Sequence, residues 1–200
     1  MPIVTLLLTA AVVLSLILLV FLPKREGLFN RWAWTITGIL YIGWLLSFLI
    51  ALRLEPGTAG FPDAGRNFVF LAILATFGSD TMAYFIGKAM GKHKLAPQIS
   101  PGKTWEGTFG GILGAVIISL LFTIDTPLQL PLNYGQAILL GVLISVFGQV
   151  GDLAESLLKR NLGVKDSGKM MPGHGGVLDR TDSILFAGVV VYLYYALVVM

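Results

Sequence analysis

Cysteine is absent from the 200-residue chain, which excludes disulfides, a thiol nucleophile and a thiolate metal site. Histidine is almost as scarce, since His93 and His174 are the only two. A catalytic zinc site usually takes three protein ligands, so this supply disfavours zinc chemistry. The sequence must therefore build any reactive site from carboxylates, hydroxyls, lysines and arginines.

Charged residues are also scarce. Only 12% of the residues are charged and 56% are hydrophobic, whereas a soluble domain has about 25% charged residues. The apolar residues form long runs, and a helix needs about 20 of them to cross the hydrocarbon core of a bilayer. These features predict an integral membrane protein.

Six apolar segments separated by proline and glycine predict the transmembrane helices. They cover Ile3–Leu22, Trp32–Leu52, Asn67–Phe85, Thr108–Ile124, Tyr134–Gly151 and Ser183–Met200. The first segment has no basic residues before it and no small-x-small cleavage site, and Lys24 and Arg25 follow it. We expect it to be a retained spanning helix rather than a signal peptide.

The predicted fold class is an all-α integral membrane protein of about six transmembrane helices, with the motifs on cytoplasmic loops. We expect one polytopic domain over residues 1–200. Within it, residues 1–66 would form N-terminal helices and residues 67–200 the catalytic region.

The basic residues alternate between connections. The first, third and fifth connections hold twelve of the fourteen lysines and arginines, and only Arg53 and Arg66 fall on the other side. By the positive-inside rule these three connections are cytoplasmic and both termini lie outside. We therefore expect a multi-pass protein of the cell (inner) membrane with its active site on the cytoplasmic side.

Asp80 interrupts the third apolar segment. A carboxylate within a membrane costs at least a few kcal/mol, so it should face a protein interior or a wet cavity. It either binds substrate or an ion, or forms a structural hydrogen bond, for which Tyr84 is one turn away. Ser100 and Lys103 follow in the third connection.

A polar cluster begins where the fifth apolar segment ends. If the helix continues, Asp152, Glu155, Ser156 and Lys159 occupy positions i, i+3, i+4 and i+7, which share one face. Such a stripe is either a solvated helix end with ion pairs or one wall of a site.

The fifth connection holds the densest set of polar groups. Gly173, Gly175 and Gly176 permit close approach of the backbone to a ligand, and nearby lysines and Arg180 suit phosphates. Asp152, Asp179 and Asp182 offer hard oxygen ligands of the kind that Mg²⁺ takes. Carboxylates, a glycine loop and cations together are what nucleotide phosphate chemistry needs.

The stretch 156–182 resembles the signature of the phosphatidate cytidylyltransferase family. It reads Ser156-x-Leu158-Lys159-Arg160, then Lys165-Asp166-x-Gly168, then Pro172-x-His174-Gly175-Gly176-Val177-x-Asp179-Arg180-Thr181-Asp182. Met171 stands where the family usually has leucine, isoleucine or phenylalanine. Upstream, Ser79-Asp80-Thr81-x-Ala83-Tyr84 and Ser100-Pro101-x-Lys103-Thr104-x-Glu106-Gly107 also resemble family motifs. Family members usually have additional N-terminal helices, so we expect a short form.

The resemblance implies transfer of a cytidylyl group from CTP to phosphatidate, with Mg²⁺ as cofactor; a second cation such as K⁺ is compatible with such sites. It implies phosphatidate drawn from the membrane, no nucleic-acid partner, and a homodimer. On this basis the metal ligands are Asp152 and Asp179. The catalytic residues are Lys159, Arg160, Lys165, His174 and Arg180, and the substrate-binding residues are Asp80, Ser100, Lys103, Ser156, Gly175, Gly176 and Asp182.

Three alternatives remain open. A CTP-dependent polyprenol or phytol kinase would place similar groups at the interface, and so would an enzyme that cytidylylates an ether lipid. A transporter would also explain an intramembrane carboxylate. Against transport, the sequence has no inverted repeat, and its charges gather on one face rather than at the midplane.

Overall fold

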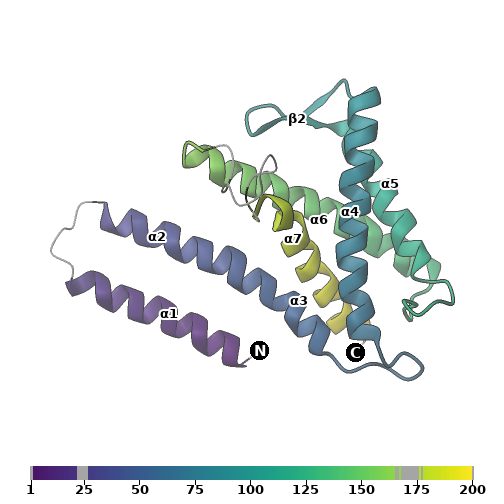
Figure 1. Ribbon diagram of the computed structural model, residues 1–200, viewed down its shortest axis with the longest axis horizontal. Coiled ribbons are helices and arrows are strands. Elements are labelled where there is room, and N and C mark those ends of the chain that lie inside the picture. The colour runs from purple at the N-terminus through teal and green to yellow at the C-terminus, as the bar shows by residue number, and fades with distance from the viewer. Residues whose placement is uncertain (1, 22–26, 165–166, 168–175, 177, 200) are drawn as a thin grey trace.

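The computed structural model describes residues 2–21, 27–164, 167, 176 and 178–199, apart from the side chains of residues 2–4 and Arg180. The chain is mostly helical (Figure 1). Its elements are α1 (Pro2–Phe21), α2 (Leu28–Gly38), η1 (Ile39–Trp44), α3 (Leu45–Leu54), α4 (Ala64–Met90), β1 (Lys94–Ala96), β2 (Ser100–Thr104), α5 (Trp105–Leu121), α6 (Tyr134–Asn161), α7 (Leu178–Tyr194) and η2 (Tyr195–Val199).

The predicted membrane fold is confirmed. In the part of the chain that the structure describes, four helical stretches are long and apolar enough to cross a membrane, and they cover Leu28–Leu54, Ala64–Met90, Tyr134–Asn161 and Thr181–Val199. Two shorter apolar helices cover Thr5–Phe21 and Trp105–Leu121. The six apolar segments of the sequence correspond to these six stretches. The stretch Leu28–Leu54 contains a π-helical insertion, η1, between α2 and α3.

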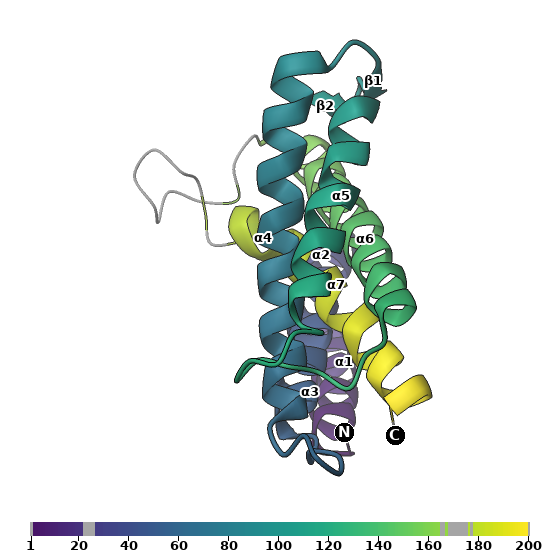
Figure 2. The same cartoon turned by 90° about the vertical axis from the view of Figure 1, so that its right-hand side faces the viewer.

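Helices α4, α5, α6 and α7 pack into the main body of the protein (Figure 2). Their core is built from apolar side chains that are almost fully buried, such as Phe68 and Leu71 of α4, Ile144 of α6 and Val191 of α7. Small residues allow the close packing of α4 on α5. A Cβ atom at Gly114 would strike the carbonyl oxygen of Gly78, so the two backbones could not approach as they do if Gly114 carried a side chain.

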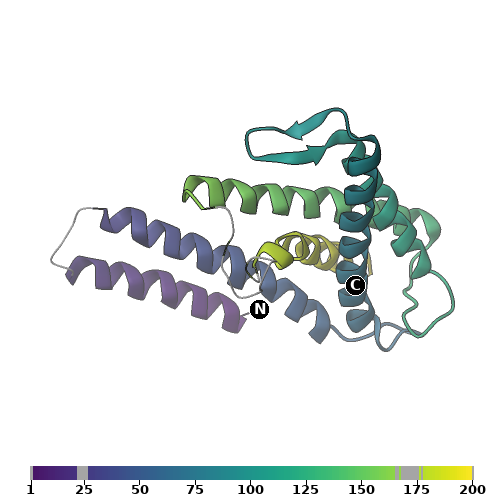
Figure 3. The same cartoon turned by 45° about the horizontal axis from the view of Figure 1, so that its top comes forward.

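Helices α1 and α2 lie side by side and extend away from the main body (Figure 3). The indole Nε1 of Trp32 donates a hydrogen bond of 2.8 Å to the Ser15 hydroxyl and ties the two helices together. Many apolar side chains of α1 are exposed, including Leu18 and Val20. In a bilayer these side chains face lipid, which is compatible with their apolar character.

Two helices run further than the apolar segments that predict them. Helix α4 continues past Phe85 to Met90, and α6 continues past Gly151 to Asn161. The helical hydrogen bonds continue into the polar residues because no proline interrupts either stretch before its end. The extension of α6 confirms the condition under which its polar residues share a face.

A β-hairpin that the sequence did not predict follows α4. Strands β1 and β2 pair antiparallel, with Lys94 opposite Thr104 and Ala96 opposite Ser100. The strands are short, and Pro97 and Pro101 favour a loop, so the sequence signal for them is weak. The hairpin crosses the end of the helical body (Figure 1).

Candidate active site

A cavity of about 770 Å³ lies between α4, the hairpin, α5, α6 and the start of α7. Six residues predicted to belong to the site line it: Asp80, Ser100, Lys103, Asp152, Asp179 and Asp182. These residues are far apart in the sequence, and the structure brings them to one place. The wall also includes Gln149 and Ser183, to which no specific role is assigned from the sequence.

The hairpin closes the cavity from the side opposite α6. Lys103 of β2 forms an ion pair of 2.7 Å with Asp152, and its ammonium also donates to the carbonyl oxygen of Gln149 at 3.4 Å. Thr104 ends the strand and caps α5, because its hydroxyl accepts a hydrogen bond from the Gly107 N–H at 3.1 Å. The cap fixes where the strand turns into the helix, and so where Lys103 enters the cavity.

The polar stripe on α6 forms as the helical spacing predicts. The Ser156 hydroxyl donates to Asp152 at 3.4 Å, and Lys159 pairs with Glu155 one turn away. Glu155 is only 1% exposed, so Lys159 is its charge partner in a desolvated place. The stripe is therefore a wall of the protein interior rather than a solvated helix end.

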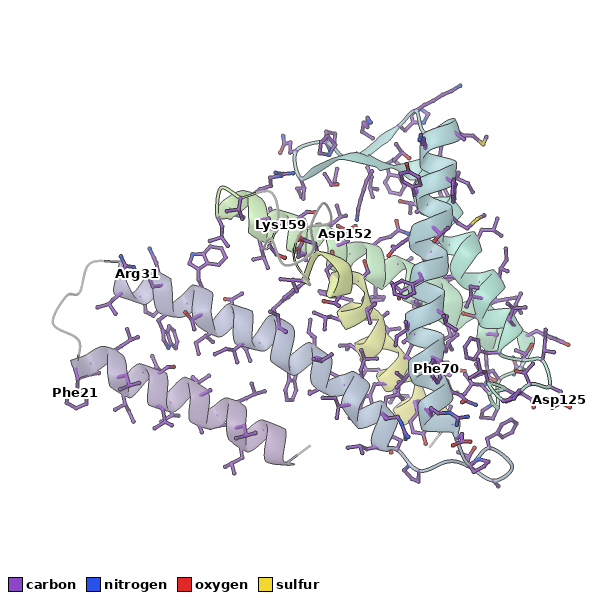
Figure 4. All side chains as sticks on the ribbon, viewed as in Figure 1. Phe21, Arg31, Phe70, Asp125, Asp152 and Lys159 are labelled. Carbon is purple, nitrogen blue, oxygen red and sulfur yellow. The ribbon has the colours of Figure 1, made fainter. Side chains whose placement is uncertain are left out.

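Lys159 also joins α6 to α7. Its ammonium donates to the Asp179 carboxylate at 2.6 Å. Figure 4 shows Lys159 and Asp152 close together on α6, next to the start of α7, and far from Asp125 at the other end of the molecule. One lysine thus holds two carboxylates that come from different helices.

Asp179 accepts several hydrogen bonds besides that of Lys159. The N–H and hydroxyl of Ser167 donate to it at 3.0 and 2.9 Å, and the N–H of Gly176 donates at 2.7 Å. Partial burial alone would raise the pKa of the Asp179 carboxyl, but the Lys159 ammonium and these donors outweigh it and hold the pKa well below its usual range. Asp179 is therefore ionised at neutral pH.

The inner wall of the cavity is a polar network between helices. The hydroxyls of Ser79 on α4 and Ser145 on α6 lie 2.8 Å apart. The Gln149 amide donates to Ser145 at 3.0 Å and to the carbonyl oxygen of Thr108 on α5 at 3.4 Å. Hydrogen-bonded groups of this kind fix three helices around a buried site. Asp182 lies nearby and is buried, with the Ser183 N–H 2.7 Å from its carboxylate.

Tyr41 reaches this region from the π-helical segment η1. Its hydroxyl donates to the carbonyl oxygen of Gly151 at 3.4 Å, and its ring packs against Phe186 with 6.2 Å between ring centroids. No pattern in the sequence indicates this contact. π-Helical insertions often occur at functional sites, and this one directs the Tyr41 hydroxyl to the Gly151 carbonyl, next to Asp152 in the sequence.

The other predicted residues are placed as follows. Arg160 is exposed, and its Nε donates to the carbonyl oxygen of Ile99 at 3.4 Å, so it braces the hairpin instead of lining the cavity. Gly176 is buried and donates to Asp179. Lys165, His174 and Gly175 lie outside the described residues, and Arg180 lies in the first turn of α7 without a described side chain.

The donor set fits Mg²⁺. That ion takes one or two carboxylates and keeps water or substrate phosphates as its remaining ligands. Asp152 and Asp179 line the same cavity and offer such oxygens. Within residues 2–21, 27–164, 167, 176 and 178–199, no three carboxylate or imidazole groups converge into a complete metal cage. This arrangement suits an ion that completes its shell with substrate oxygens.

A model of the cytidylyltransferase family matches residues 1–198. The chain belongs to the cytidylyltransferase family. It is 41% identical over 185 residues to a phosphatidate cytidylyltransferase of Bacillus subtilis, covering 92% of this chain and 65% of that protein. It is 43% identical over 169 residues to a phosphatidate cytidylyltransferase of Staphylococcus aureus, covering 82% of this chain and 59% of the relative.

A third relative carries no activity in its name. Uncharacterized protein YnbB of Escherichia coli is 38% identical over 174 residues, covering 87% of this chain and 54% of that protein. The chain thus spans less than two thirds of the length of these curated relatives. The match with the family model includes every residue that lines the cavity.

Proposed function

We propose that this chain transfers the cytidylyl group of CTP to phosphatidate, giving CDP-diacylglycerol and pyrophosphate. The observation that carries the proposal is the cavity in which Lys103, Asp152 and Asp179 meet at the ends of apolar helices. A water-soluble nucleotide and a membrane lipid must both reach the reaction centre. A polar cavity bounded by membrane helices meets that requirement.

In the proposed reaction, an oxygen of the phosphatidate phosphate forms a bond to the α-phosphorus of CTP. The bond from that phosphorus to the oxygen bridging to the β-phosphate breaks, and pyrophosphate leaves. The attacking phosphate is already anionic near neutral pH, so the site does not need a strong general base. Repulsion between the two anionic substrates is the main obstacle, which makes positioning and charge neutralisation the work of the protein.

The cations of the site supply that neutralisation. Lys103 of β2 lines the cavity itself, and Lys159 of α6 is bound to Asp179, which lines the cavity from α7. Both are held by carboxylates, which orients their ammonium groups before substrate arrives. Ser100 and Gln149 offer neutral hydrogen bonds on the same wall. Lys165, Arg180 and His174 complete the proposed set of phosphate-binding residues.

Asp152 and Asp179 are the proposed ligands of Mg²⁺. When bound, Mg²⁺ neutralises charge on phosphate oxygens and makes the phosphorus more electrophilic. Asp179 is suited to this role because hydrogen bonds keep it ionised and fixed in orientation. Asp152 is half-exposed at the cavity wall and pairs with Lys103. The Lys103 ammonium would shift from Asp152 toward the substrate phosphates when the substrates bind.

The proposed site faces the cytoplasm, where CTP is found. The positive-inside rule supports this side, because the hairpin connection and the α6–α7 connection carry most of the lysines and arginines. Phosphatidate would then come from the inner leaflet of the cell membrane.

The test is a transfer assay with the chain purified in detergent. Phosphatidate, Mg²⁺ and CTP labelled at the α-phosphate are mixed, and labelled lipid and pyrophosphate are measured together. The proposal predicts equal amounts of the two products, and loss of at least about a hundredfold in rate for Asp179→Asn. Asp125→Asn is the matched control, since Asp125 lies at the opposite end of the molecule. A folded protein that makes no labelled lipid would refute the proposal.

A further inference from the structure

Helix α4 carries an exposed stripe whose chemistry changes along its length. Phe70, Leu74, Phe77, Thr81, Tyr84 and Lys88 follow one another at helical spacing and so share one face. Phe70, Leu74, Phe77 and Tyr84 are exposed by 42%, 39%, 51% and 60%, and Thr81 and Lys88 are exposed as well. The opposite face of α4, with Leu71, Ala75 and Ser79, is buried. The stripe is thus accessible from outside the helical body.

The upper half of this stripe is also a wall of the cavity. Phe77, Thr81, Tyr84 and Lys88 line it, whereas Phe70 and Leu74 lie beyond its edge on the same face. Figure 4 shows Phe70 low on α4, away from Asp152 and Lys159 of α6. The cavity therefore opens at Phe77 onto an apolar surface within the membrane span Ala64–Met90.

The polarity of the stripe matches an amphiphile. Its lower part carries the phenyl and isobutyl groups of Phe70, Leu74 and Phe77, and its middle carries the Thr81 hydroxyl. Its upper part carries the Tyr84 phenol and the Lys88 ammonium, which lie 3.4 Å apart. From Phe77 to Lys88 the helix rises about 16 Å. The reactive carboxylates and Lys103 lie in the same cavity as this upper part. A lipid with an anionic head would have its head in the cavity and its chains along the apolar part.

We infer that the α4 stripe is the route by which the lipid acceptor enters the cavity, with its acyl chains against Phe70, Leu74 and Phe77. This inference rests on the proposed function for the identity of the acceptor, an anionic phospholipid with a phosphomonoester head. Lys88 and Lys103 provide charge complementary to that head. Thr81 and Tyr84 form the mouth through which the head passes.

The apolar part of the stripe should contribute little to the binding free energy of the lipid and act mainly as its path into the cavity. An acyl chain gains little on moving from neighbouring lipid to an apolar helix face, because lipid tails are as apolar as leucine. Shortening Phe77 should therefore have a small effect, and selectivity should come from the polar head. Blocking the mouth with a bulky side chain should have a large effect.

Photocrosslinking locates the lipid without relying on activity. The purified chain is mixed with phosphatidate that carries a diazirine on one acyl chain, irradiated, and digested for mass spectrometry. The inference predicts adducts on residues 70–84 of α4, which excess phosphatidate suppresses and phosphatidylcholine does not. Adducts found mainly on other helices, or equal suppression by both lipids, would overturn it.

A pair of tryptophan variants tests the mouth by kinetics. Thr81→Trp should lower kcat/KM for phosphatidate by about tenfold or more and leave KM for CTP within about twofold. Phe85→Trp is the matched control, because Phe85 is exposed on the same helix but does not line the cavity. Equal kinetics for the two variants would contradict the inference.

The two proposals fail in distinguishable ways. Adducts on α4 without cytidylyl transfer from CTP would refute the proposed reaction and support the lipid route. Cytidylyl transfer with adducts on other helices would support the reaction and refute the lipid route. A second copy of the chain is the other possible occupant of the stripe. Since the chain lacks cysteine, Leu74→Cys tests this directly, and a disulfide-linked dimer through that position in a bilayer would overturn the lipid route.

Discussion

At the scale of single residues, Lys159 of α6 pairs with Glu155 on its own helix and with Asp179 of α7, and so joins the two helices. Glu155 is almost fully buried, and a buried charge without a partner is strongly unfavourable. Asp179 has additional donors in Ser167 and Gly176, whereas among the described residues Glu155 forms an ion pair with Lys159 alone. Glu155 therefore depends on Lys159 more than Asp179 does.

Lys159→Met should destabilise the protein by about 3–5 kcal/mol, because it leaves the Glu155 carboxylate buried without a counter-charge. The double variant Glu155→Gln/Lys159→Met should recover much of that loss, since the uncompensated charge is gone. Thermal unfolding in detergent measures both. A double variant that is no more stable than Lys159→Met would show that Glu155 is not the group that needs the lysine.

Activity separates the two roles of Lys159. The double variant should stay inactive in the transfer assay despite its recovered stability, because Lys159 also supplies positive charge beside Asp179. Recovery of both properties together would mean that Lys159 has only a structural role.

Tyr41→Phe should lower kcat by about two- to tenfold with little change in the unfolding temperature, because only the hydroxyl that contacts Gly151 next to Asp152 is removed. Tyr195→Phe is the matched control. It removes a tyrosine hydroxyl that donates to the Pro56 carbonyl oxygen at 2.7 Å, in the α7–η2 end of the core. The control should lose stability and keep kcat. Similar kinetics in the two variants would count against a positioning role for Tyr41.

The sequence predicted some of these residues and missed others for a physical reason. Asp152, Glu155, Ser156 and Lys159 share a face because of local helical spacing, which a sequence displays directly. The contact from Tyr41 to Gly151 joins residues 110 positions apart, and no local pattern encodes it. Likewise, the sequence could not show that Arg160 turns toward Ile99 instead of the cavity.

At the scale of elements, α4 and α5 pack closely against each other, and both contribute residues to the cavity wall. Gly114 sits at this crossing, where an added Cβ would meet the Gly78 carbonyl oxygen and Met82. The carbonyl belongs to the backbone and cannot move aside as a flexible side chain can.

Gly114→Ala should therefore destabilise the protein by about 1–3 kcal/mol through overpacking. Gly43→Ala is the control, since Gly43 is also helical but has open space where the Cβ would lie. That variant should be neutral or slightly stabilising, because alanine favours a helix. Unfolding temperatures in the same detergent compare the two. Equal effects would mean that the crossing tolerates a wider separation.

The elements themselves were largely predictable. Long apolar runs give the helices, because a spanning helix must satisfy its backbone groups internally and present apolar side chains to lipid. The hairpin was missed because β1 has three residues and its partner contains Pro101. Its stability comes from tertiary contacts such as Lys103 with Asp152 and Arg160 with Ile99, and these depend on the helices it meets.

At the scale of the whole molecule, the arrangement of the helices separates two ends. The hairpin, Asp152 and Lys159 lie toward one end, and Asp125 lies in the connection between α5 and α6 at the other (Figure 4). The distribution of lysine and arginine predicts that the first of these ends is cytoplasmic.

The absence of cysteine makes that orientation measurable with single substitutions. Asp125→Cys should react with a membrane-impermeant maleimide on intact spheroplasts, because Asp125 is exposed and its connection is predicted to lie outside. Lys92→Cys should react only after the membrane is permeabilised, since it lies in the hairpin connection. The reverse pattern would put the site on the wrong side for cytosolic CTP.

The most direct test of the central claim follows the two ends of the CTP triphosphate in parallel reactions with phosphatidate, one labelled at the α-phosphate and one at the γ-phosphate. Cytidylyl transfer predicts that the α-label enters the lipid and the γ-label leaves as pyrophosphate. Transfer of the γ-label to a lipid, with the α-label left in CDP, would contradict the account and assign the chain to a CTP-dependent lipid kinase instead.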